Sequence, residues 1–139
     1  MIRFQHICIL TTLLLCSCGR TPSEERFEKT TGISIPKNVE VLKDDYHDMI
    51  QDYAIEYSIR LTSDQLTEVT TSILSSKFFN PAIVGDEIIR DEYFPRESAN
   101  SVWYRTNTGF CFTNRNDRTG VAVQLNTATH EMEFSEWHD

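Results

Sequence analysis

The sequence predicts an α+β fold, with an antiparallel sheet of about five to six strands and one main helix packed on one face. Three observations lead to this prediction. Residues 52–61 alternate in polarity, residues 62–76 space their apolar side chains as a helix does, and residues 102–134 form short alternating segments between turns. A period of two is typical of a half-buried strand, and a helix with one apolar stripe must cover another layer.

A short helix is expected first, over residues 24–30. Ser23 is its expected N-cap, Phe27 its inward-facing residue and Gly32 its end. The chain then becomes extended, because a residue before proline is disfavoured in helical geometry. Residues 39–42 are expected to begin the first strand.

The clearest periodic signal in the chain is the second strand. Its larger apolar side chains alternate with small or polar ones: Tyr53, Ile55, Tyr57, Ile59 and Leu61 against Asp52, Ala54, Glu56, Ser58 and Arg60. We expect this strand to form a hairpin with residues 39–42, closed by a polar turn over residues 44–51.

The main helix is predicted from its start signal. Thr62 and Gln65 have the spacing of a capping box, and Leu66, Val69 and Ile73 follow on one helical face. Its threonines and serines are mediocre helix formers, so the helix is expected to depend on packing against the sheet.

The rest of the chain is expected to be a long connection followed by strands. Residues 80–100 are predicted to connect, with one short strand among them. Gly120 is expected to take a positive φ in a tight turn. An antiparallel meander is predicted over residues 102–105, 109–113, 121–125 and 132–134.

The N-terminus has the pattern of an export signal. Residues 7–16 are a ten-residue apolar run, about half of the roughly 20 residues that span a bilayer as a helix. The run ends in Leu15-Cys16-Ser17-Cys18, which resembles the lipobox of bacterial lipoproteins: a branched apolar residue, a tolerant position, a small residue and cysteine. This resemblance covers residues 1–20 and implies that Cys18 is acylated and becomes the first mature residue. An ordinary secretory leader and a short buried helix are the alternatives.

The domain boundaries follow from that resemblance. Residues 1–17 are the lipoprotein signal peptide, residues 18–25 the lipidated cysteine and tether, and residues 26–139 a single α+β domain. Two or three acyl chains on Cys18 imply stable attachment to the lipid bilayer of the bacterial cell envelope. Gly19 favours the outer membrane over the inner, and both of its faces stay open. In outline the domain also resembles uncharacterised Gram-negative lipoproteins, from which no functional residue is carried over.

Charge and cysteine content restrict the partners. Removing residues 1–17 leaves 122 residues with 12 of the 13 basic side chains and all 21 acidic ones, a formal charge of about −9. Nucleic-acid binding rests on cationic contacts to phosphate, so no nucleic-acid partner is expected. An acidic surface suits a basic protein partner or simple solubility. Cys111, which Phe110 and Phe112 flank in the sequence, is the one cysteine left unmodified, and it is expected to be a small packed side chain.

Patterns that carry chemistry are missing from the sequence. It has no H-E-x-x-H, no G-x-S-x-G and no glycine-rich phosphate loop. We therefore predict no catalytic residue, no metal and no cofactor. The acids of residues 44–52 are expected to form a solvated turn, since their spacing is unlike that of a calcium loop.

Aromatic residues are the candidates for partner binding. Trp103 and Tyr104 are neighbours in a predicted strand, so they must point to opposite faces. Aromatic residues in strands are usually core residues, and the alternative is that one of these two is exposed and serves in recognition. Trp137, near the C-terminus, is the third candidate.

The sequence therefore predicts a membrane-anchored envelope lipoprotein that is non-enzymatic and binds a protein or supports an envelope assembly. A narrower alternative is an inhibitor or immunity protein against a basic toxin or hydrolase. An envelope hydrolase with paired carboxylates and a carrier of small ligands are the rival classes.

Overall fold

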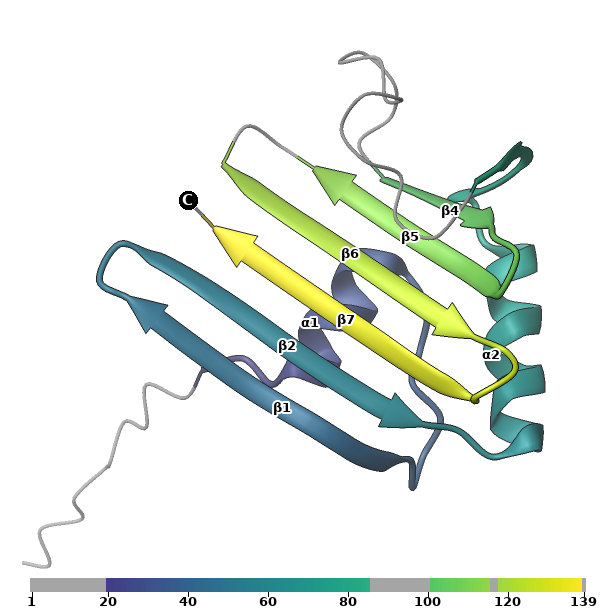
Figure 1. Cartoon of the computed structure of the whole chain (residues 1–139), viewed down its shortest axis with the longest axis horizontal. Helices are drawn as coiled ribbons and strands as arrows, with labels where there is room; N and C mark the ends of the chain where they lie inside the picture. Colours follow the sequence, from purple (N-terminus) through teal and green to yellow (C-terminus); the bar gives the residue numbers. More distant parts are fainter. Residues whose placement is uncertain (1–19, 86–100, 116–117, 139) are drawn as a thin grey trace, which may run out of the picture.

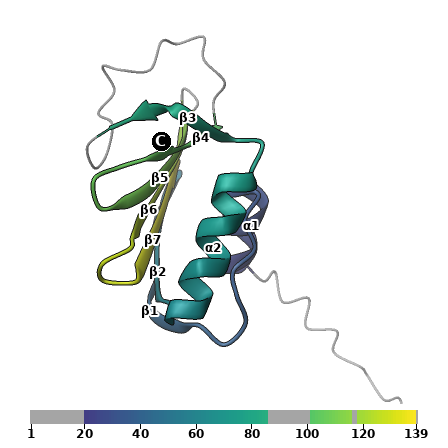
Figure 2. The same ribbon diagram turned by 90° about the vertical axis from the view of Figure 1, so that its right-hand side faces the viewer.

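The computed structural model describes residues 20–85, 101–115 and 118–138. These residues form one sheet with two helices on one face, and no helix of theirs lies on the other face (Figures 1 and 2). In chain order the elements are α1 (Ser23–Thr31), β1 (Glu40–Met49), β2 (Asp52–Arg60), α2 (Ser63–Ser75), β3 (Phe79–Val84), β4 (Ser101–Arg105), β5 (Gly109–Arg115), β6 (Thr119–Asn126) and β7 (Glu131–His138).

The predicted antiparallel sheet of five to six strands with one main helix is wrong. The described sheet has seven strands in the order β1-β2-β7-β6-β5-β4-β3. It is mixed, because β3 runs parallel to β4 while every other pair is antiparallel. The parallel pair arises because the chain crosses from β2 to the far edge through α2, and the meander β4–β7 then fills the space between.

Helix α1 confirms the predicted short helix and its end. Gly32 is left-handed, with φ of 70°, and its N–H donates to the Glu28 carbonyl at 2.9 Å. The predicted N-cap is wrong, because Pro22 holds that position and no side chain caps the helix. The hydroxyl of Ser23 instead donates to Asp44 of β1. The helix begins inside the predicted tether, residues 18–25.

The β1–β2 hairpin is confirmed, but β1 is longer than predicted. The expected polar turn over residues 44–51 is wrong, because the ladder with β2 continues as far as the pair Met49–Asp52. Only Ile50 and Gln51 form the turn. Pairing with β2 holds β1 in the sheet, although the polar residues of β1 give it no apolar face.

Helix α2 starts as the sequence predicts. The Thr62 side chain accepts a hydrogen bond from the Gln65 backbone N–H, and the Gln65 side chain accepts one from the Thr62 N–H at 2.8 Å. Val69 and Ile73 are buried against the sheet, whereas Leu74 is exposed. The predicted short strand after α2 is β3, and residues 86–100 of the predicted connection lie outside the described residues.

The antiparallel meander β4-β5-β6-β7 is confirmed. The expectation for Gly120 is wrong, because its φ is not positive. Gly120 pairs with Trp137, and a Cβ at this position would lie 2.0 Å from the indole ring. The glycine therefore provides room for a neighbouring side chain instead of a turn conformation.

The core lies between the sheet and the two helices. Phe27 of α1 packs edge-on against Phe134 of β7, with ring centroids 5.8 Å apart. Further fully buried side chains come from α2 and the central strands: Val69, Ile73, Ile55, Ile59, Trp103, Phe112, Leu125 and Met132. The core residues thus come from both helices and from the central strands, and none of them comes from β1.

Candidate functional site

Two of the predicted partner-binding residues lie inside the protein. Trp103 and Tyr104 are both 0% exposed, so the alternative in which one of them faces solvent is wrong. Trp103 faces the helices, packs on Phe112 and donates its indole N–H to the Thr31 carbonyl at 3.2 Å. Tyr104 belongs to a second buried cluster with Val102 and Cys111. Cys111 is buried, as its flanking phenylalanines predicted.

Trp137 is half-buried on the sheet face opposite the helices. It pairs with Ala54 on one neighbouring strand and with Gly120 on the other. These small residues give the indole ring a place on the sheet. A role in partner binding stays a prediction for Trp137. Cys18 lies outside the described residues, so its lipidation stays a prediction as well.

Strand β1 is exposed to solvent along nearly its whole length. Every side chain from Glu40 to Asp48 is exposed. Among the described residues, six large apolar side chains are exposed, and four of them lie on β1 or its turn: Val41 (53%), Leu42 (40%), Tyr46 (39%) and Ile50 (98%). We call these four, together with the β1 acids Glu40, Asp44, Asp45 and Asp48, the β1 strip.

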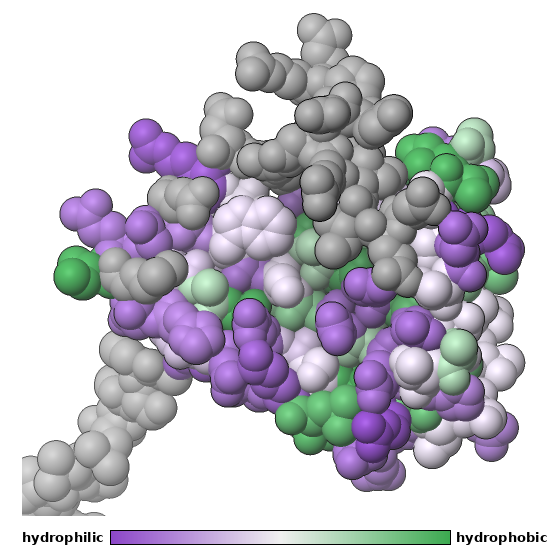
Figure 3. Space-filling view, in the orientation of Figure 1, coloured by the Kyte–Doolittle hydropathy of each residue, from purple (hydrophilic) through white to green (hydrophobic). Residues whose placement is uncertain are grey.

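Hydrophilic side chains surround these apolar ones. Figure 3 shows the face without helices, with purple hydrophilic surface over the β1–β2 side and green hydrophobic surface at its lower margin and left-hand end. Contiguous apolar surface rimmed by polar side chains is typical of a surface that binds another molecule, whereas apolar side chains exposed singly are common on any protein.

The backbone at the tip of the hairpin is strained. Ile50 has φ of 74°, a conformation that costs an L-residue with a branched Cβ roughly 1–2 kcal/mol. Glycine is the usual residue at a positive φ in a two-residue hairpin turn. A fully exposed isoleucine there gives neither burial nor a relaxed turn, so the side chain itself is a candidate for a function.

Two arginines connect the start of the described chain to the sheet. Arg20 donates to Asp44 at 2.9 Å and lies over the Tyr46 ring at 4.7 Å. Ser23 is buried and donates to the same Asp44 oxygen at 2.6 Å. The N-terminal segment is thereby held against β1.

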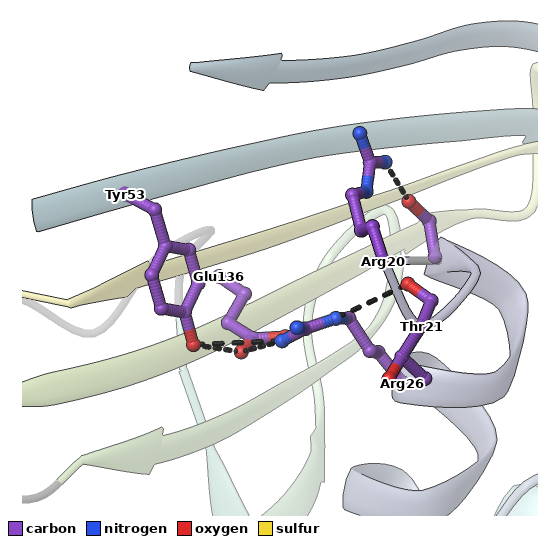
Figure 4. Close-up of polar contacts among 6 residues, drawn as sticks. Arg20, Thr21, Arg26, Tyr53 and Glu136 are labelled. Atoms are coloured by element: carbon purple, nitrogen blue, oxygen red, sulfur yellow. Dashed lines mark hydrogen bonds and ion pairs between the residues drawn. The ribbon is translucent and has the colours of Figure 1, made fainter. Parts of the chain in front are cut away.

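The second arginine joins α1 to two strands. Arg26 donates to Glu136 of β7 at 2.8 Å, and the Tyr53 hydroxyl of β2 donates to the same oxygen at 2.5 Å (Figure 4). The Tyr53 ring stacks between Tyr46 and His138. Desolvation and then Glu136 raise the pKa of Tyr53, so its hydroxyl remains a donor at neutral pH. These contacts together join the start of the described chain and α1 to strands β1, β2 and β7.

Tyr57 gives a test of this acidic side of the sheet. Burial, followed by the charges of Glu24, Asp44 and Glu28, raises the pKa of Tyr57 from 10 to about 12. The folded state therefore keeps a proton that the unfolded state loses. The contribution of Tyr57 to the free energy of unfolding should therefore be fully present below pH 10 and should be lost as the pH rises from 10 to 12.

Denaturant unfolding across this pH range measures that loss. Tyr57→Phe should lose less stability than the wild type between pH 10 and 12, and ultraviolet titration should lack one late-ionising tyrosine. Parallel losses in the two proteins would contradict the assignment.

An Asp–His–Glu group lies on the face without helices. Ligand atoms of Asp45, His47 and Glu56 are all within 4.8 Å of one another, and all three residues are exposed. The Lys43 ammonium pairs with Glu56 and lies 3.7 Å from Asp45, so a metal ion would have to displace it. Hydrogen bonding from Lys43 lowers the pKa of Glu56, whereas a general acid needs a raised pKa.

A shallow hollow lies on the same face over β5, β6 and β7. Its volume is about 100 Å³, and the lining includes Thr113, Ala122, Gln124, Glu133 and Ser135. Pockets for small organic ligands usually hold about 300–1,000 Å³. The size of this hollow does not favour a carrier of such ligands.

Comparison of the chain with protein-family models, curated proteins and solved structures found no match. Of the two helices in residues 20–85, neither has the length and apolar character that crossing a membrane requires.

Sequence analysis missed the β1 strip. Residues 43–48 have polar side chains on both faces of the strand, and without apolar alternation they resemble a turn. One signal was available: Tyr46 in a run of charged residues, followed by the apolar Ile50 at a turn.

Proposed function

We propose that this chain is a lipid-anchored protein of the bacterial cell envelope that acts by binding another protein at the β1 strip. The observation that carries the proposal is the gathering of exposed apolar side chains on one acidic edge strand and its turn. Burial of Val41, Leu42, Tyr46 and Ile50 against a partner would recover the hydrophobic free energy that they forgo in the free protein.

The length of chain between Cys18 and α1 limits how far the proposed anchor can be from this strip. Ser23 is buried and bonded to Asp44 of β1, and four residues lie between it and Cys18, so the two Cα atoms can be at most about 18 Å apart when the chain is fully extended. An acylated Cys18 would therefore hold the β1 strip near the bilayer surface. The leader residues support an address in the envelope, with the outer membrane favoured by Gly19.

The acidity of the strip favours a basic partner. Strand β1 carries four carboxylates against one lysine, in a chain whose formal charge is −8. Arg60 pairs with Glu40 and Arg20 with Asp44, so the excess negative charge of the strip comes from its remaining acids and from the chain as a whole. Opposite charge on a partner would steer association and disfavour acidic competitors. An inhibitor of a basic toxin or hydrolase is a narrower form of the same proposal.

In-cell crosslinking followed by affinity capture and quantitative mass spectrometry tests this function. The test variant combines Val41→Thr with Ile50→Gly, which removes two exposed apolar side chains and relaxes the positive φ. Its stability should equal or exceed that of the wild type, so lost capture cannot arise from unfolding. Leu74→Ala is the matched control, because Leu74 is exposed on α2 away from the strip.

One dominant partner should be captured by the wild type and by Leu74→Ala, and at least fivefold less by the double variant. A tagged lipoprotein of unrelated sequence sets the background. Equal recovery of the partner by the wild type, Leu74→Ala and the double variant would contradict binding at the strip. Absence of any protein enriched over the unrelated lipoprotein would contradict the binding function.

A further inference from the structure

The outer edge of β1 is open for hydrogen bonding. β1 is the terminal strand of the sheet order, so within the described residues it pairs on one side only, with β2. It is also the longest strand, at ten residues. An edge of this length is a template on which an extended chain can add as a further strand.

The two edges of the sheet differ in how they resist such an addition. The edge strand β3 has six residues and contains Pro81, which has no backbone N–H to offer. β1 contains no proline. Charged side chains often protect an edge, but exposed Val41, Leu42 and Tyr46 on the same strand weaken that protection.

The register identifies which backbone groups face outward. The Met49–Asp52 pair flanks a two-residue turn, where facing residues exchange hydrogen bonds. Hydrogen-bonded and non-bonded pairs alternate along an antiparallel ladder. The backbone groups of His47 and Asp45 therefore bond to β2. The N–H and C=O groups of the alternate residues point outward: Asp48, Tyr46 and Asp44.

We propose that β1 accepts an extended, basic segment of the partner protein as an eighth strand of the sheet. This inference rests on the proposed binding function and adds its geometry and the chemistry of the partner. The outward backbone groups supply the pairing, the apolar side chains supply contact area, and the carboxylates favour lysine or arginine on the incoming strand.

A second copy of this chain is a poorer occupant. Pairing β1 with another β1 would bring two strands together that each carry four carboxylates and one lysine. Like charges opposite one another destabilise a ladder. The charge of the strand therefore favours a different, basic chain.

Blocked nine-residue peptides provide the probe. One alternates lysine and valine, and its control alternates glutamate and valine. Binding to the full-length protein in detergent is measured by fluorescence anisotropy, and amide hydrogen exchange is followed with and without peptide. Strand addition should protect the outward amides of Asp44, Tyr46 and Asp48, whereas the amides of Asp45 and His47 are already paired with β2.

Two substitutions at one position separate the backbone from the side chain. Tyr46→Pro and Tyr46→Val both remove the aromatic ring, but only proline removes the outward N–H, and an outward position on an edge strand tolerates it. Loss of that bond should weaken binding of the lysine peptide about tenfold further in Tyr46→Pro than in Tyr46→Val. The exchange pattern of the wild-type protein tests the proposal even if Tyr46→Pro fails to fold.

Protection confined to these alternate amides, together with the proline effect, would support strand addition. Equal binding by the two Tyr46 variants, protection on another element, preference for the glutamate peptide or self-association through β1 would each overturn it. The proposed function is judged separately: a partner that the wild type captures in cells, and that Tyr46→Pro captures equally, contradicts strand addition alone.

Discussion

Replacing Cys18 with alanine is expected to abolish labelling by a clickable fatty acid and to move the protein from the membrane fraction to the soluble fraction. Each acyl CH₂ that enters the bilayer contributes about 0.8 kcal/mol, and two or more chains give stable anchoring. Without them, the remaining apolar run of residues 7–16 has about half of the roughly 20 residues that a spanning helix needs.

Cys16→Ala is the matched control for this experiment. It removes the neighbouring cysteine from the same leader and leaves the small residue Ser17 before Cys18. Labelling should persist in Cys16→Ala and vanish in Cys18→Ala. Persistent labelling of Cys18→Ala would contradict the assignment of Cys18 as the acylated residue.

Replacing Trp103 with alanine is expected to lower the free energy of unfolding by about 3–5 kcal/mol. The side chain is fully buried against Phe112, and its N–H satisfies the Thr31 carbonyl at the end of α1. Truncation would leave a cavity and an unpaired buried carbonyl. Thermal unfolding of the soluble Cys18→Ala protein should shift downward by about 10–20 °C.

Trp137→Ala provides the comparison, because Trp137 is half-buried at the opposite face. Its truncation should lower stability by only about 1 kcal/mol. The contrast between the two tryptophans tests the burial that overturned the sequence prediction. Unchanged stability in Trp103→Ala would show that this side chain does not belong to the core.

Local patterns predicted the elements whose signals lie within a few residues. The alternation of Tyr53 to Leu61 identified β2, because one face of that strand packs on the helices. The hydroxyl of Thr62 and the side chain of Gln65 identified the start of α2, since a capping box is closed by neighbours in the chain. Gly32 identified the end of α1 through its left-handed conformation.

Patterns failed where the environment is set by distant residues. Strand β1 has no apolar face to reveal it, so only its pairing with β2 distinguishes it from a turn. β3 contains Pro81, which argues against a strand until its place at the edge is known. Trp103 and Tyr104 alternate in direction as expected, but both faces of β4 are covered.

The sequence by itself determined the short-range features of this protein: the lipobox-like residues 15–18, the excess of carboxylates, the capping box and the period-two strands. Each is set by residues close together in the chain, or by composition. The tertiary structure decided the strand order, the parallel edge, the burial of Trp103 and Tyr104, and the open edge that forms the β1 strip. These depend on register between segments far apart in sequence, since the same strand is core or edge according to which neighbour it acquires.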